Sequence, residues 1–123
     1  MTKLIIGIAS TDYIRRRTID IAAGRLVPKD SDPKIWLTSL ESIGKLLDGN
    51  NSALLDAIRV HHPETVSELA KLTGREQSNV SRTLSRMADF HMVELQDNNR
   101  GGKKPVVNWD ELSVKTEYSV DAA

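Results

Sequence analysis

The chain has 123 residues, and its 17 basic and 17 acidic residues give it a formal net charge of zero. This length suits one domain with a modest hydrophobic core. The absence of cysteine excludes disulfide frameworks and thiolate metal sites. The apolar run at residues 4–9 is too short for a signal-peptide core, and no later run could span a membrane, so we expect a cytoplasmic protein.

The first predicted element is a strand at residues 3–9 (KLIIGIA), which is almost continuously apolar and therefore favours a buried strand over a disordered tail. A helix should follow, capped by Thr11 or Asp12, and run to about Ala23 before Gly24 ends it. Its predicted inner face consists of Ile14, Thr18, Ile21 and Ala22.

Three consecutive arginines, Arg15, Arg16 and Arg17, lie in this predicted helix. Because consecutive residues point in different directions on a helix, two interpretations stay equally open. The arginines could form a solvated face with salt bridges to Asp12 or Asp20, or they could contact phosphate.

Residues 25–34 contain two prolines and read as a connector, after which residues 35–37 are expected to be extended. A helix is predicted from about residue 39 to 47, and a break at residues 49–51. The next helix, from 53 to about 61, should be capped by Asn51 or Ser52, and Pro63 prevents its extension. The predicted buried positions of the two helices are Leu40, Ile43, Leu46, Leu47, Leu54, Leu55 and Ile58.

Residues 65–90 predict two short helices joined by a turn. Thr65 and Glu68 have the spacing of a capping box, in which each side chain accepts from the backbone N–H of the other residue. Gly74 tolerates the positive φ needed where the first helix ends. Apolar residues of this helix at helical spacing are Val66, Leu69 and Ala70.

The second of these helices has a narrow apolar stripe formed by Val80, Leu84 and Met87. Arginine, serine, asparagine and glutamine on its other faces are the side chains that donate to phosphates and base edges in the major groove. The alternative is a solvated amphipathic helix, but Glu76 is the one acid between residues 75 and 88, whereas such helices usually alternate acids and bases. The polar set comprises Arg75, Gln77, Ser78, Asn79, Ser81, Arg82, Ser85, Arg86 and Asp89.

A basic hairpin is predicted next, with strands at 92–96 and 105–109 around the turn 97–102. Its loop carries Arg100, Lys103 and Lys104. Such a hairpin after a recognition helix is typical of a wing that touches backbone or enters a minor groove, although an ordinary basic hairpin is the simpler alternative. Residues 112–120 alternate in part, which favours a third strand or a dimer contact.

Basic charge is concentrated locally, because residues 75–104 hold six bases and four acids while residues 105–123 hold one base and four acids. A locally basic face suffices for DNA binding, but few phosphate contacts per subunit imply weak binding by one copy. A homodimer is therefore expected.

No enzyme, cofactor or metal site is predicted. The three histidines lack metal-ligand spacing, and no nucleophile motif or phosphate-binding glycine loop occurs. Trp36 and Trp109 are expected to be core or interface anchors rather than base-stacking platforms.

Residues 66–109 resemble the winged helix-turn-helix of MarR-like transcription regulators. The matching positions are Leu69, Ala70, Thr73, Gly74, Ser78 to Arg82, Leu84 and Met87. The whole chain resembles a smaller group of predicted MarR-like regulators, some linked to toxin–antitoxin pairs, that share a segment like PKIWLTSLES at residues 33–42. The resemblance implies a homodimer with Ser78, Asn79 and Arg82 nearest the bases and Arg100 at the wing. MarR proteins dimerise through long terminal helices, which this sequence does not predict.

The expected fold class is α+β, mainly α, a winged helix-turn-helix with an N-terminal strand-helix extension. Residues 1–34 would form the extension, for dimerisation or partner binding, 35–112 the DNA-binding domain and 113–123 a C-terminal strand or tail. The expected function is a repressor or autoregulator that binds double-stranded DNA. The alternatives are an antitoxin that neutralises a partner toxin and a winged helix used only for protein contacts. The expected DNA-binding residues are Arg75, Gln77, Ser78, Asn79, Ser81, Arg82, Ser85, Arg86, Arg100, Lys103 and Lys104.

Overall fold

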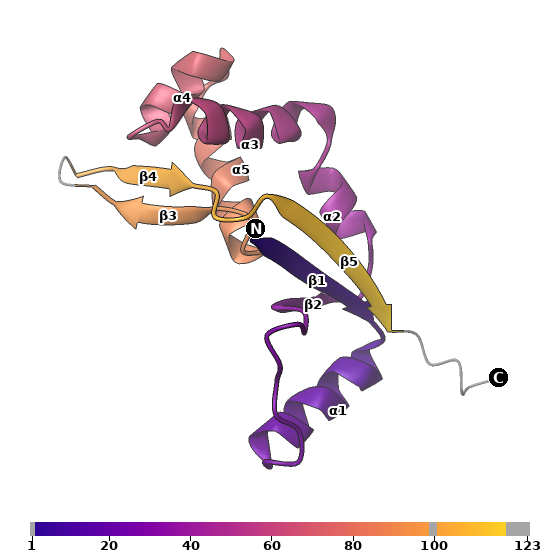
Figure 1. Ribbon diagram of the computed structural model, residues 1–123. Coiled ribbons are helices and arrows are strands. Elements are labelled where there is room, and N and C mark those ends of the chain that lie inside the picture. Colours follow the sequence, from indigo (N-terminus) through magenta and orange to yellow (C-terminus); the bar gives the residue numbers. More distant parts are fainter. Residues whose placement is uncertain (1, 99–100, 118–123) are drawn as a thin grey trace.

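A computed structural model describes residues 2–98 and 101–117 and shows an α+β fold with two small sheets (Figure 1), which confirms the α+β part of the predicted class. Over these residues the elements follow in the order β1 (Lys3–Ala9), α1 (Thr11–Ala22), β2 (Ile35–Leu37), α2 (Glu41–Leu46), α3 (Gly49–His61), α4 (Val66–Thr73), α5 (Gln77–Asp89), β3 (Glu94–Asp97), β4 (Lys103–Val106) and β5 (Glu111–Glu117).

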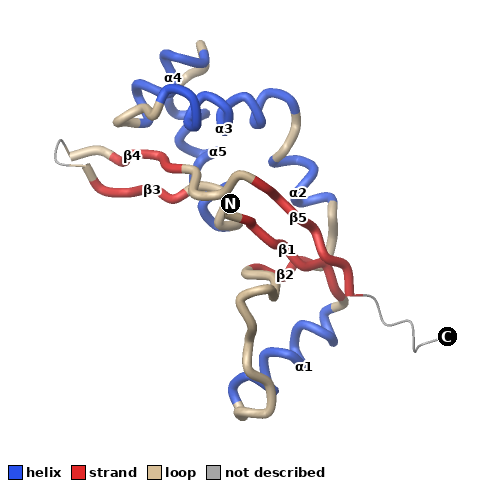
Figure 2. The backbone as a smooth tube through the Cα atoms, in the orientation of Figure 1, coloured by secondary structure: helices blue, strands red, loops and turns tan. Residues whose placement is uncertain are grey.

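The central sheet has three parallel strands in the order β2-β1-β5 (Figure 2). β1 pairs with β5 over its whole length, from Lys3 opposite Glu111 to Ala9 opposite Glu117. The predicted strands at residues 3–9 and 35–37 are confirmed, and so is a strand in the C-terminal segment. The sheet thus joins residues from all three predicted segments of the chain.

The two faces of β1 have different neighbours. Leu4, Ile6 and Ile8 alternate along the strand and are at most 5% exposed, within the main hydrophobic core. On the opposite face Gly7 lies directly under the ring of Trp36, its register partner on β2. The absence of a side chain at residue 7 allows the indole ring to lie flat on the strand.

Helix α1 projects from the sheet rather than packing into the core (Figure 1). None of its residues is buried, so the predicted inner face of Ile14, Thr18, Ile21 and Ala22 is wrong. A three-stranded sheet offers little area beneath the helix, and the ring of Trp36 fills much of it. Tyr13 lies 5.2 Å from that ring and the Arg17 guanidinium 5.4 Å, measured to its centroid.

The start of α1 also differs from the prediction. The N-cap is Ser10, whose hydroxyl accepts from the backbone N–H of Tyr13 at 3.1 Å, so Thr11 and Asp12 are the first helical residues. The helix ends before Gly24, whose φ of +78° is the left-handed conformation that favours glycine.

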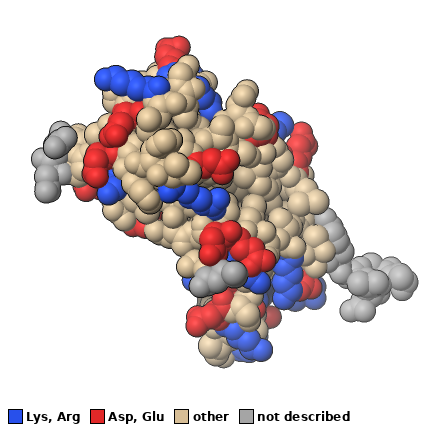
Figure 3. Space-filling model, turned by 45° about the horizontal axis from the view of Figure 1, so that its top comes forward, with Lys and Arg blue, Asp and Glu red and all other residues tan. Residues whose placement is uncertain are grey.

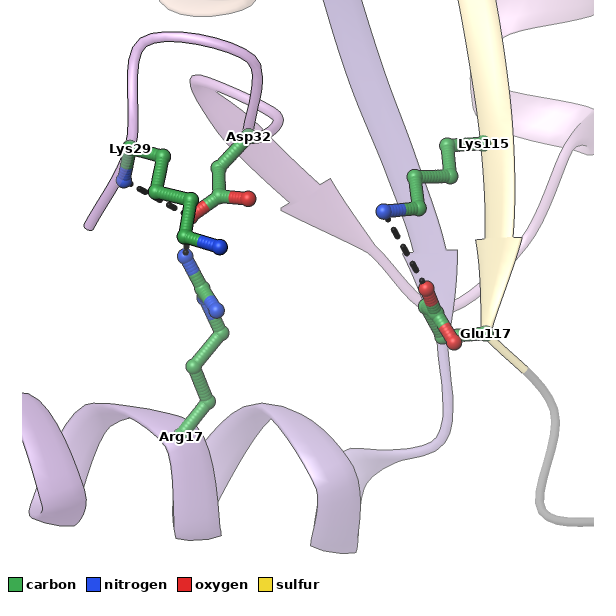
Figure 4. A network of polar contacts seen from close by, with 5 residues as sticks. All are labelled: Arg17, Lys29, Asp32, Lys115 and Glu117. Atoms are coloured by element: carbon green, nitrogen blue, oxygen red, sulfur yellow. Dashed lines mark hydrogen bonds and ion pairs between the residues drawn. The ribbon is translucent and has the colours of Figure 1, made fainter. Parts of the chain in front are cut away.

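An ion pair holds the connector after α1. The Arg17 guanidinium donates to the Asp32 carboxylate at 3.0 Å, and the backbone N–H of Lys29 donates to the same oxygen at 2.9 Å (Figure 4). The hydrogen bond from Lys29 and then that from Arg17 lower the pKa of Asp32 below its ordinary value. Figure 4 also shows the 3.4 Å ion pair between Lys115 and Glu117 on β5.

Two expectations for the middle helices are wrong. In α2, Ile43 and Leu46 are buried but Leu40 is 52% exposed, because it precedes the helix as its N-cap. Residues 49–51 begin α3 instead of breaking a helix, since the Asp48 carboxylate caps it by accepting from the N–H of Asn51 at 2.9 Å.

The main core lies between β1 and the last three helices. The predicted inward positions Leu54, Leu55 and Ile58 of α3 are buried and meet side chains from α4 and α5. The hairpin β3–β4 packs beside α3 and α4. In this arrangement one face of α5 packs in the core and the opposite face lies on the surface.

The first prediction concerns the contact between Gly7 and Trp36. Gly7→Ala would drive a methyl group into the indole ring, and we expect it to lower the free energy of unfolding by about 1–3 kcal/mol. Thermal unfolding followed by circular dichroism measures the decrease. Gly44→Ala is the control, because the added Cβ meets no atom of another element within 4 Å, and it should keep or raise the melting temperature because alanine favours the helix. An unchanged melting temperature for Gly7→Ala would contradict the close approach.

The second prediction concerns Asp32. Because its pKa is lowered in the folded protein, its contribution is complete above the ordinary carboxyl pKa and is lost as pH falls through the folded value. Asp32→Asn should therefore lower the melting temperature at pH 7, and the difference should shrink in acid. Asp30→Asn, which changes an exposed neighbour, serves as control. A difference that stays unchanged down to the lowest pH at which the parent remains folded would count against the carboxylate as the cause.

Candidate nucleic-acid interface

Helices α4 and α5 are joined by a short turn. The Thr65 hydroxyl caps α4 by accepting from the N–H of Glu68 at 3.0 Å, as predicted. The reciprocal bond is shifted by one residue, since the Glu68 carboxylate accepts from the N–H of Glu64 at 3.0 Å. Gly74 has the expected left-handed conformation, with φ +67°. The chain can therefore reverse within three residues before α5 starts.

Helix α5 has one buried face and one exposed face. Val80, Leu84 and Met87 are completely buried, which confirms the predicted apolar stripe. Ser78, Arg82 and Ser85 on the opposite side are exposed. The core thus fixes the rotation of the helix about its axis, and a row of polar side chains faces outward.

Arg75 has a structural role that the sequence did not reveal. It is partly buried, and its guanidinium donates to the carbonyl of Asn50 and the side-chain oxygen of Asn51, both at 3.3 Å, and also to the side-chain oxygen of Asn79. It therefore connects the start of α3 to the first turns of α5. Neither Arg75 nor the oxygen of Asn79 is free in this conformation.

The other polar residues of α5 differ in their surroundings. Ser78 donates to the carboxylate of Glu76 at 3.0 Å, and Ser81 is partly buried. Arg82 and Arg86, one helical turn apart, have no hydrogen bond or ion pair with any residue that the structure describes, and Gln77 and Ser85 are exposed. A shallow open groove along the helix is lined by Asn79, Ser81, Arg82, Thr83, Ser85 and Arg86.

The hairpin β3–β4 is shorter than predicted. Its antiparallel pairs run from Glu94 opposite Val106 to Asp97 opposite Lys103. Met92 and Val93 precede it as buried core residues, rather than forming part of a strand. The predicted contact residue Arg100 lies outside the described residues.

Acidic partners hold both lysines of the hairpin. Lys103 forms an ion pair with Asp97, and Lys104 lies 3.5 Å from the carboxylate of Glu64, which precedes α4. The hydrogen bond from Lys103 lowers the pKa of Asp97. The pair of Lys104 with Glu64 joins residues 40 positions apart, a proximity that no local pattern predicts.

Trp109 attaches the hairpin to α3. Its indole N–H donates to the carbonyl of Met92 at 2.8 Å, and the Arg59 guanidinium lies 4.4 Å from the ring centroid. Arg59 also donates to the carbonyl of Trp109 at 2.9 Å. Trp109 is thus a partly buried anchor, as expected, whereas no pattern in the sequence predicts the role of Arg59.

Charge is mixed on the surface around these elements. Figure 3 shows acidic side chains interspersed with basic ones over the visible face. Arg82 and Arg86 on α5 are exposed cations without an ion pair among the described residues.

Among the described residues, no helix is both long and apolar enough to cross a membrane, and no cluster of histidine and acidic side chains could hold a metal ion. A comparison with curated proteins finds no match. Residues 46–114, more than half of the chain, match the protein family HVO_A0114. This segment begins at the last residue of α2 and includes α3, α4, α5, the hairpin and the first half of β5. The chain belongs to the HVO_A0114 family.

Proposed function

We propose that the protein is a transcription regulator, a repressor or autoregulator, that binds specific sequences of double-stranded DNA as a homodimer. In this proposal α3, α4 and α5 form a helix-turn-helix domain, α5 is the recognition helix and β3–β4 is the wing. The observation that carries the proposal is the exposed polar face of α5, which lies opposite a completely buried stripe.

The chemistry of that face suits a major groove. Unpaired guanidinium groups at Arg82 and Arg86 can donate two parallel hydrogen bonds to guanine or one to each of two phosphate oxygens. Ser78 and Ser85 are small, so they allow the helix backbone to approach the base edges. Since Arg75 and Asn79 bond to each other, they orient the start of the helix and leave Arg82 and Arg86 to contact DNA.

The wing would contribute through exchange of ion pairs. Lys103 and Lys104 can leave Asp97 and Glu64 and pair with phosphates, but the released acids then face the DNA. Each lysine of the wing should therefore add little affinity, and two subunits bound to one operator are needed for tight binding at physiological salt. Twofold symmetry would place two half-sites about 10 base pairs apart, or a multiple of that distance.

A second candidate is a protein-interaction role as an antitoxin that neutralises a toxin enzyme encoded beside it. It is favoured by α1, which has no buried residue and exposes Tyr13, Ile19 and Ile21. Both roles can occur in one chain. Co-expression with the product of the adjacent gene, with recovery of a complex that Ile19→Asp abolishes, would support this role, and a failure to bind DNA would leave it unaffected.

The third prediction tests the recognition helix. Genomic fragments selected by the purified protein should share a palindromic site, and Arg82→Ala should weaken binding to that site by about 1–3 kcal/mol and relax its base preference. Fluorescence anisotropy with labelled duplexes measures both effects. Arg25→Ala, which changes an exposed arginine of the connector after α1, is the control and should bind as the parent does. Equal affinities for the two variants would exclude α5 as the reading element.

The fourth prediction tests the wing. Lys103→Ala with Lys104→Ala should weaken binding to every sequence and reduce the slope of log K against log salt by about 0.9 for each phosphate that is no longer neutralised. Glu64→Gln with Asp97→Asn removes the competing acids and should strengthen binding to specific and unrelated duplexes alike. If the acid variants bind no more tightly than the parent, these lysines do not exchange their partners for phosphate.

A further inference from the structure

Among the described residues β5 is an edge strand of the central sheet. Its ladder among the described residues is with β1, whereas β1 is paired on both sides. The strand is seven residues long, and its ladder with β1 is continuous and contains no proline. Proteins usually protect such an edge with a short strand, charged side chains, a bulge, a proline or a covering segment. β5 carries the charged side chains Glu111, Lys115 and Glu117. Among residues 2–98 and 101–117 no strand other than β1 pairs with β5, so its outer backbone groups are open to a further strand there.

The apolar face of the sheet also continues to this edge without cover. Val114 is the register partner of Ile6, so the two side chains lie on the same face. Ile6 is completely buried, but Val114 is 41% exposed. A neighbouring strand on the outer side of β5 would bring a side chain against Val114.

The sequence of β5 is complementary to itself in one antiparallel register. A twofold axis perpendicular to the sheet pairs each residue with its mirror position about a central residue. Centring on Ser113 places Glu111 opposite the partner's Lys115 and Leu112 opposite the partner's Val114, and symmetry repeats each pair. Within one chain Glu111 lies 3.8 Å from Lys3 and Lys115 lies 3.4 Å from Glu117, so the pairs across the axis would extend these exposed ion pairs. Opposite charges and apolar pairs in directly facing positions stabilise a sheet.

The neighbouring registers lack this complementarity. Centring on Val114 places Glu111 opposite the partner's Glu117, and centring on Lys115 places two lysines opposite each other. Centring on Leu112 places Asp110 opposite the partner's Val114. Like charges in facing positions destabilise pairing, so the Ser113 register is selected by the residues themselves.

We propose that two copies of the chain dimerise through antiparallel pairing of β5 centred on Ser113, which forms one continuous sheet in the order β2-β1-β5-β5-β1-β2. Its apolar face continues across the axis through Ile6, Val114, the partner's Leu112 and the partner's Leu4. Because facing residues lie on the same side of a sheet, both sets of α3, α4 and α5 lie on one side. Both α1 helices lie on the other side.

This interface deepens the proposed function by naming its dimer contact, but it rests on β5 and does not require DNA. It would give a twofold dimer through a sheet rather than through the long terminal helices of MarR proteins. The paired strands come from the C-terminal part of each chain, and the helices that would contact DNA are left uncovered.

The fifth prediction is a charge-swap experiment without DNA, read by analytical ultracentrifugation. Lys115→Glu and Glu111→Lys should each raise the dimer dissociation constant by at least about tenfold, because each creates two like-charge pairs across the axis. The double variant Glu111→Lys/Lys115→Glu restores opposite charges across the axis but sets like charges against Lys3 and Glu117 within each chain, so its constant should fall well below those of the single variants. Lys71→Glu on α4, an exposed residue on a helix far from β5 in Figure 1, is the control and should leave the constant unchanged.

Oxidative cross-linking tests the same interface in case the charge variants fold poorly. Since the chain contains no cysteine, Ser113→Cys would place two thiols on the axis, and mild oxidation should give a covalent dimer. Thr116→Cys, which would face the partner's Asp110, should not cross-link. The interface would be overturned if the parent protein is monomeric at all concentrations. It would also be overturned if the single charge changes leave the dimer dissociation constant unaltered.

The two proposals can fail separately. A dimer with the expected charge-swap behaviour but no DNA binding would contradict the proposed function and support the interface. DNA binding by a dimer whose dissociation constant does not respond to β5 substitutions would support the proposed function and contradict the interface.

Discussion

The ladder between β1 and β5 is the constraint on which the rest of the structure depends. It pairs every residue of β1 with one of β5, and β1 in turn buries Leu4, Ile6 and Ile8 in the core that supports the helices. Trp109 lies just before β5, and its ring contacts the Arg59 guanidinium of α3 while its indole N–H donates to the carbonyl of Met92. The hairpin and α5 are therefore oriented by a sheet in which neither of them takes part.

The candidate site combines basic residues that have protein partners with basic residues that have none in the described part of the chain, whose formal net charge is zero over the whole sequence. Arg75, Lys103 and Lys104 have protein partners, so their charges serve the fold in the free protein. Arg82 and Arg86 stand on a helix whose other face is held by Val80, Leu84 and Met87. Rigid support of a few unpaired donors favours discrimination between ligands over strong attraction to any polyanion.

Local patterns predicted local structure well. The spacing of Val80, Leu84 and Met87, the cap at Thr65 and the positive φ at Gly74 all depend on residues within one or two helical turns. The caps at Ser10 and Asp48 could not be chosen from the sequence, because several polar residues compete within three positions and the path of the preceding segment decides between them.

Contacts between residues far apart in the chain could not be predicted from these local patterns. The parallel partner of β1 lies more than a hundred positions away along the chain, and Glu64 and Lys104 are 40 positions apart. Neither proximity follows from periodicity or capping, since each depends on how whole elements pack against one another. The face of α5 could thus be predicted from its own residues, whereas the ion pairs of Lys103 and Lys104 in the β3–β4 hairpin with acids could not.

The ladder between β1 and β5 also has a consequence for biosynthesis. During translation β1 emerges first, and more than a hundred further residues must be added before β5 can pair with it. Parallel pairing between such distant segments forms slowly, and an apolar strand that waits for its partner is prone to aggregate. A chain interrupted by the ribosome before residue 111 would expose Leu4, Ile6 and Ile8 on an incomplete sheet, so we expect nascent and truncated chains to be preferred substrates for chaperones and proteases.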